Sequence, residues 1–204
     1  GSGALLAASA TSLAEAQVIR DAGLDAIIAQ GYEAGGHRGI FDPDGPDAQL
    51  ALPDLLTALR PLGLPLIAAG GIMDGADAAG FLDAGAVAVQ MGTAYVACPE
   101  SAASPAHRAR LGRAGEDTVM TRAISGRPAR GFQNRLTALG AAPGAPALPD
   151  YPITYDAGKA VAAAAGVDYA AQWAGTGSAR ARALPAAELT AALGREIAAA
   201  RKTA

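Results

Sequence analysis

The feature that most constrains the fold is a unit that occurs three times: an apolar run of strand length, then glycine, then helical sequence. The runs cover 24–30, 65–70 and 86–91, and they lead into Gln30-Gly31, Gly70-Gly71 and Gly92-Thr93. Strands that are apolar along their length and alternate with helices indicate a parallel sheet covered by helices. Residues 5–8 add a shorter strand candidate, so four strands are expected, at about 4–9, 24–30, 65–70 and 86–91.

Helix start and stop signals separate these runs. Ser12 and Glu15 have the spacing of a capping box, which predicts a helix over 13–22 that ends at Gly23. Asp74 can cap a helix that continues to about Asp83. The remaining expectations are helices over 53–60, 105–114, 157–165 and 185–200, and loops over 41–49 and 139–152. We expect the tail to wrap around the sheet, so that 1–204 form a single domain.

Composition excludes several classes of protein. The net charge of −3 gives no general basic character that would favour nucleic acid or an acidic membrane. The single cysteine, Cys98, excludes an internal disulfide framework and suits a reducing cytoplasm. No apolar run reaches the roughly 18–20 residues that a membrane span needs, and no charged-then-apolar leader opens the chain. These features predict a cytoplasmic protein.

The loop after the second strand carries the clearest sign of a site. Its sequence, DAIIAQGYEAGGHRG over 25–39, places Gly35 and Gly36 directly before His37. Glycines let the main chain approach a ligand closely, and histidine titrates near neutral pH. Backbone N–H groups at 71, 92 and 93 could donate to phosphate oxygens. Two interpretations stay open for these glycines: a phosphate site, or tight strand-to-helix turns.

Four segments in this order, AQGYEAGGHRG, PLIAAGGIMDG, AVQMGTAYVACPES and ISGRPARGFQN, resemble the FMN-dependent nitronate monooxygenases, formerly called 2-nitropropane dioxygenases. The resemblance implies a TIM (β/α)8-barrel type of α/β fold, of which this chain carries about the last four strands and the C-terminal helices. It also implies that an N-terminal half of the barrel is absent from the chain. Another chain, or a second copy in a homodimer, would then complete the barrel.

The resemblance further implies the chemistry and the residues of the site. Such proteins oxidise alkyl nitronates or nitroalkanes with dioxygen to a carbonyl compound and nitrite, which makes His37 the catalytic residue. Gly35 and Gly36 would lie close to the flavin. The other implied FMN-binding residues lie at the strand ends: Gln30, Gly70, Gly71, Gln90, Met91, Gly92 and Thr93. The spacing of histidine, cysteine and carboxylates predicts no metal site.

Two alternatives remain. FMN-dependent enoyl-acyl-carrier-protein reductases carry a similar glycine-glycine-histidine loop, and the seven arginines between His107 and Arg135 could recognise an acidic carrier protein or a nucleotide phosphate. The chain could also be a non-catalytic half-barrel fragment or subunit. Of the other titratable residues, we expect Glu33 and Arg38 to form a loop ion pair or to tune His37, and His107 to be a solvated helix residue.

Overall fold

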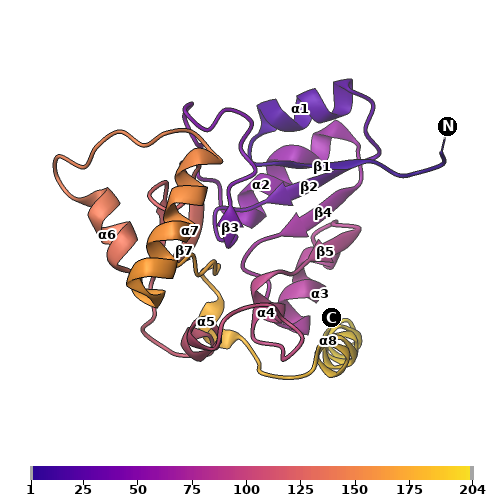
Figure 1. Ribbon diagram of the computed structural model, residues 1–204. Coiled ribbons are helices and arrows are strands. Elements are labelled where there is room, and N and C mark those ends of the chain that lie inside the picture. The colour runs from indigo at the N-terminus through magenta and orange to yellow at the C-terminus, as the bar shows by residue number, and fades with distance from the viewer. Residues whose placement is uncertain (1, 203–204) are drawn as a thin grey trace.

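A four-stranded parallel sheet is the larger of two sheets in the computed structural model, which describes residues 2–202 (Figure 1). Its order is β1-β2-β4-β5, with β1 at Ala7–Ala10, β2 at Ala26–Gln30, β4 at Leu66–Ala69 and β5 at Ala88–Gln90. The connections are α1 (Leu13–Asp21), α2 (Leu52–Leu59) with the 3-10 turn η1 (Arg60–Leu62), and α3 (Gly75–Asp83). The predicted parallel α/β arrangement is therefore confirmed.

The helix signals read from the sequence act as expected. Ser12 Oγ accepts a hydrogen bond from the backbone N–H of Glu15 at 3.3 Å and caps α1. The Asp74 carboxylate accepts from the N–H of Asp77 at 2.9 Å and caps α3. Such caps satisfy backbone donors that have no partner inside the helix. The strands are shorter than expected, and the first lies at 7–10 instead of 5–8.

One face of this sheet packs against the helices. The register aligns Ala8, Ile27 and Leu66 in one row and Ala10, Ala29 and Ala68 in another. Both rows belong to a core that includes Ile19 of α1 and three leucines of α2, Leu52, Leu55 and Leu59. Burial of each large aliphatic side chain contributes about 1.5–3 kcal/mol. The alternate row of the sheet, Ser9, Ile28, Ile67 and Ala88, is only half-buried.

A second, antiparallel sheet was not expected from the sequence. Its order is β3-β7-β6, with β3 at Gly36–His37, β7 at Ala129–Phe132 and β6 at Thr118–Thr121. It is accompanied by α5 (Pro105–Arg110), α6 (Arg135–Ala141), α7 (Ile153–Ala165) and the turn η2 (Val167–Tyr169). In Figure 1, α6 and α7 stand beside the parallel sheet instead of covering it. The first residues of the expected loop over 139–152 are helical, because α6 continues to Ala141. The loop ends in a turn at Tyr151 that leads into α7.

Of the tail that was expected to wrap around the sheet, the last helix, α8 (Ala186–Ala200), packs against α3, whereas α6 and α7 do not cover the sheet (Figure 1). Glu196 of α8 accepts a hydrogen bond from the N–H of Gly75 at 2.8 Å and pairs with Arg182 at 2.6 Å. The short helix α4 (Thr93–Val96) follows β5 and contacts the 3-10 turn η3 (Ser178–Arg180), which precedes α8. Within residues 2–202, no helix combines the length and apolarity that crossing a membrane requires.

Candidate functional site

A small cavity of about 90 Å³ lies where β2, β4 and β5 end. It brings together seven residues that the sequence analysis placed in the site: Gln30, Gly35, Gly70, Gly71, Gln90, Gly92 and Thr93. The strand ends therefore meet as the parallel arrangement predicts. Met91 instead packs into the hydrophobic core, and Gly36 lies in β3, outside the lining of the cavity.

Glycines make up six of the thirteen residues that line the cavity. Gly70 and Gly71 have φ values of 115° and 72°, which side chains with a Cβ rarely adopt. The cavity is smaller than the roughly 300–1,000 Å³ of pockets that enclose whole ligands. It therefore suits a compact group such as a phosphate, held by backbone amides.

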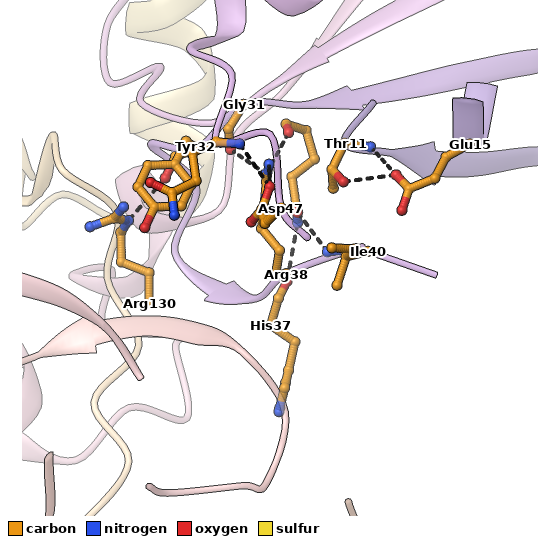
Figure 2. Close-up of polar contacts among 12 residues, drawn as sticks. Thr11, Glu15, Gly31, Tyr32, His37, Arg38, Ile40, Asp47 and Arg130 are labelled. Carbon is orange, nitrogen blue, oxygen red and sulfur yellow. Dashed lines mark hydrogen bonds and ion pairs between the residues drawn. The ribbon is translucent and has the colours of Figure 1, made fainter. Parts of the chain in front are cut away.

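The loop that carries His37 is held in place by hydrogen bonds on both sides of the histidine. The Gln30 side chain accepts from the N–H of Gly39 at 2.7 Å and donates to the carbonyl of His37 at 3.1 Å. Arg38 donates to the carbonyls of Gln30 and Gly31 and forms a two-pronged ion pair with Asp47. Figure 2 shows the His37 side chain pointing away from this network. The backbone is thus fixed while the imidazole stays available.

Aromatic rings surround the imidazole. The ring centroids of Tyr151, Tyr155 and Trp173 lie 5.4, 5.9 and 5.4 Å from that of His37. Nε2 of His37 lies 3.0 Å from Oγ of Ser125. Burial, and then the charge of Arg127, lower the pKa of His37, so the neutral imidazole predominates at pH 7. These three aromatic residues were not identified from the sequence, where no spacing links them to His37.

Arg38 forms the expected loop ion pair with Asp47, whereas the expectations for Glu33 and His107 were wrong. Glu33 and Arg38 do not pair, since Glu33 accepts from the N–H of Leu52 and Arg38 pairs with Asp47. Neither contributes to the lowered pKa of His37. His107 is only 9% exposed, and its Nε2–H donates to the carbonyl of Trp173 at 3.1 Å. A carbonyl can only accept, so this bond fixes the tautomer of His107.

Residues 172–178 form a strap that joins the cavity to the His37 loop. The N–H of Gly175 donates to Thr93 Oγ1 at 2.9 Å, and the N–H of Thr176 donates to the carbonyl of Glu33 at 3.0 Å. Gly175 and Gly177 also line the cavity. Neither glycine was expected in the site, although two glycines separated by one residue, close to the only tryptophan, are a recognisable signal in the sequence.

Three of the seven arginines between 107 and 135 are ion-paired or buried. Arg110 pairs with Glu116 at 2.6 Å, and Arg122 pairs with Asp44 at 2.6 Å. Arg130 is buried, with its guanidinium over the ring of Tyr32. These three side chains are thus less free to bind an acidic carrier protein or a nucleotide phosphate than the sequence suggested.

Neither metal binding nor a reactive cysteine is indicated within the described residues. Within the described residues, no group of three or more histidine, cysteine or carboxylate side chains could hold a metal ion. The Cys98 thiol is 1% exposed, and burial raises its pKa. A buried thiol with a raised pKa is a poor nucleophile.

The chain resembles known proteins along almost its whole length. The family model described as "Nitronate monooxygenase" matches residues 1–196. A nitronate monooxygenase of Paraburkholderia phytofirmans is 55% identical over 203 residues, covering 96% of this chain and 55% of the relative, and one of Pseudomonas aeruginosa is 52% identical, covering 92% and 55%. The chain thus spans about half the length of these relatives.

Solved structures agree with this similarity. A nitroalkane oxidase from Streptomyces ansochromogenes superposes with a TM-score of 0.87 at 40% identity, covering 98% of this chain and 59% of that one. FabK from Thermotoga maritima superposes with a TM-score of 0.78 at 26% identity, covering 98% and 63%.

Proposed function

Because the chain belongs to the nitronate monooxygenase family, we propose that it supplies the phosphate-binding and histidine-bearing part of a flavin-dependent enzyme that oxidises alkyl nitronates. Dioxygen would be the oxidant, and a carbonyl compound and nitrite the products. The observation that carries the proposal is the cavity at the ends of β2, β4 and β5, which adjoins the loop of His37 through Gly35. A glycine two residues before His37 is thus part of the wall of the proposed phosphate cavity.

The residues present fit FMN. The cavity has the size of a phosphate site, and the hydroxyl of Thr93 at its wall already accepts from the N–H of Gly175, which leaves its hydrogen free to donate to a phosphate oxygen. Gly36 has a φ of 79°, and a Cβ placed there would meet open space, so a flat ring can approach its main chain. Bound flavin supplies the redox chemistry, and the protein supplies orientation and electrostatics.

In this proposal His37 acts on the substrate in two ways. The neutral imidazole, favoured by the lowered pKa, can accept the proton alpha to the nitro group of a neutral nitroalkane. The protonated imidazole can donate a hydrogen bond to a nitronate anion. The rings of Tyr151, Tyr155 and Trp173 would limit the access of water and bound the space for the alkyl group.

The parallel sheet is, in this proposal, one wall of a (β/α)8 barrel. Its half-buried row would face the barrel interior, and β1 and β5 are edge strands with one neighbour each. Strands from outside these 204 residues would close the wall. The flavin ring would then lie between this chain and the completing half.

Replacing His37 with Ala in the flavin-loaded protein tests the role of the imidazole. We expect turnover to fall by about 100-fold or more, the usual contribution of a positioned acid or base. The flavin absorption band should persist, because no phosphate-cavity residue changes. Mass spectrometry of the released cofactor identifies FMN directly. Unchanged turnover would remove His37 from the mechanism, and a colourless protein would support a non-catalytic subunit.

A further inference from the structure

The hydroxyl of Ser125 makes three contacts in a fully buried position. Ser125 is 0% exposed and lies in the turn before β7. Its Oγ lies 3.0 Å from the carbonyl oxygen of Arg127, 3.4 Å from the backbone nitrogen of Arg127, and 3.0 Å from Nε2 of His37. A hydroxyl has one hydrogen to donate and two lone pairs to accept with.

Only one assignment of protons satisfies all three contacts. The carbonyl of Arg127 can only accept, so it takes the Ser125 hydrogen. The N–H of Arg127 can only donate, so it uses one lone pair. The remaining lone pair faces Nε2 of His37, which must therefore carry a hydrogen. If the Ser125 hydroxyl instead donated to Nε2 of His37, the Arg127 carbonyl would lose this hydrogen bond and one lone pair of the hydroxyl would be unused.

We propose that Ser125 is a positioning residue for His37: it holds the neutral imidazole as the Nε2–H tautomer and leaves Nδ1 as the nitrogen that exchanges a proton with the substrate. Nδ1 has no hydrogen-bond partner within residues 2–202, and it is not among the buried atoms that lack one, so it is open to solvent or a ligand. This inference rests on the proposed function and adds to it the atom that reacts.

The surroundings of the ring fit this role. The charged or titratable groups that face it are Arg127 from the same turn as Ser125, and Tyr151 and Tyr155 at the start of α7. Trp173 of the strap adds an uncharged ring. The Arg127 guanidinium is itself held by the carbonyl of Ile40. When Nδ1 takes a proton, the positive ring strengthens its Nε2–H bond to Ser125, so the hydroxyl stabilises the charged form.

Nitrogen NMR of the flavin-loaded protein labelled with ¹⁵N-histidine tests the tautomer directly. We expect His37 at high pH to show a protonated Nε2 and an unprotonated Nδ1. His107, whose Nε2–H donates to Trp173, should show the same tautomer and serves as an internal reference. Resonances are assigned with His37→Gln and His107→Gln. A neutral His37 protonated on Nδ1 overturns the proposal, whatever the activity of the protein.

Substitution of Ser125 tests whether its hydroxyl stabilises the protonated form of His37. In Ser125→Ala we expect the pKa of His37 to fall, because the acceptor that favours imidazolium is lost, and the pH profile of kcat with a neutral nitroalkane or a nitronate to move to lower pH. At the wild-type optimum, kcat should fall roughly tenfold, with KM little changed. Ser125→Thr, which keeps the hydroxyl, should restore the profile.

The two proposals can fail separately. A wild-type protein with the Nε2–H tautomer but no nitronate oxidation would refute the proposed function and leave the role of Ser125 standing. A pH profile and a His37 titration that stay unchanged in folded Ser125→Ala would refute the positioning role alone. Far-UV circular dichroism and the His107 titration show whether the variant is folded.

Discussion

Only 1% of the Arg38 side chain is exposed, and within residues 2–202 its carboxylate partner is Asp47, 18% exposed. Removing one member of a buried ion pair leaves an uncompensated charge, which costs about 3–5 kcal/mol. We therefore predict that Asp47→Asn lowers the free energy of unfolding by about 3 kcal/mol, measured by urea denaturation at pH 7. Asp44→Asn is the matched control: its exposed pair with Arg122 should contribute about 1 kcal/mol or less.

The ion pair of Arg38 and Asp47 also makes the stability of the fold depend on pH. Burial alone would raise the pKa of Asp47, but hydrogen bonds from Arg38 and the N–H of Gln49 lower it below its ordinary value. A carboxyl with a lowered pKa stabilises the fold above its unfolded pKa, and this stability is lost as pH falls through the folded pKa. The stabilities of wild type and Asp47→Asn should converge in acid. A difference between them that is constant from pH 7 to pH 3 would contradict this account.

For single residues, the sequence identifies candidate site residues better than it identifies the groups with which their side chains pair. Gly70, Gly71 and His37 could be recognised because strand ends and local glycine patterns are contiguous in the chain. The partner of Arg38 could not, because Glu33 is the nearer carboxylate in sequence and Asp47 only becomes adjacent when the loop folds back. His107 was wrongly expected to be solvated for the same reason, since Trp173 lies 66 residues away.

Among the elements, those of the parallel sheet were predicted within a few residues and those of the second sheet were missed. Caps and apolar runs are local signals, and they located α1, α3 and β4. By contrast, β6 and β7 are short and lack a continuous apolar run. They are stabilised by pairing with each other and with β3 of the His37 loop, about 90 residues earlier. Non-local pairing of this kind overrides local propensity.

The strap over 172–178 gives a prediction at the scale of an element. A Cβ on Gly35 would lie 2.4 Å from the backbone nitrogen of Gly175 and 2.6 Å from the carbonyl carbon of Ala174. Both are backbone atoms, so relieving the clash requires the strap itself to move. We predict that Gly35→Ala displaces the strap, lowers stability by about 1–3 kcal/mol and weakens cofactor binding. Trp173, the only tryptophan, reports strap movement as a red-shifted fluorescence maximum.

The control for this substitution is Gly80→Ala. Gly80 lies in α3, and a Cβ there would meet nothing within 4 Å. Alanine is favoured over glycine inside a helix by about 1 kcal/mol. This variant should therefore be slightly more stable than wild type, with an unchanged Trp173 spectrum. A Gly35→Ala protein that keeps the wild-type spectrum and cofactor affinity would show that the strap is not coupled to the His37 loop.

For the whole molecule, the uncovered face and the free edges of the parallel sheet determine whether the chain alone associates with other copies. One face is covered by α1, α2 and α3, whereas the row of Ile28 and Ile67 on the other face is half-buried. Near the edge strands, Leu5, Leu6 and Val87 are 85%, 58% and 63% exposed. Unpaired strand edges beside exposed apolar side chains are templates for association.

We therefore predict that the 204-residue chain alone self-associates and binds a hydrophobic dye, measured by size-exclusion chromatography with light scattering. Production together with the N-terminal half of the Pseudomonas aeruginosa relative should yield a discrete one-to-one complex and reduce dye binding, because the added strands cover both edges. Leu5→Lys with Leu6→Lys should reduce self-association of the chain alone, since charges on an edge oppose pairing. A monodisperse monomer that binds no dye would mean that the sheet needs no further strands, and the barrel proposal would fail.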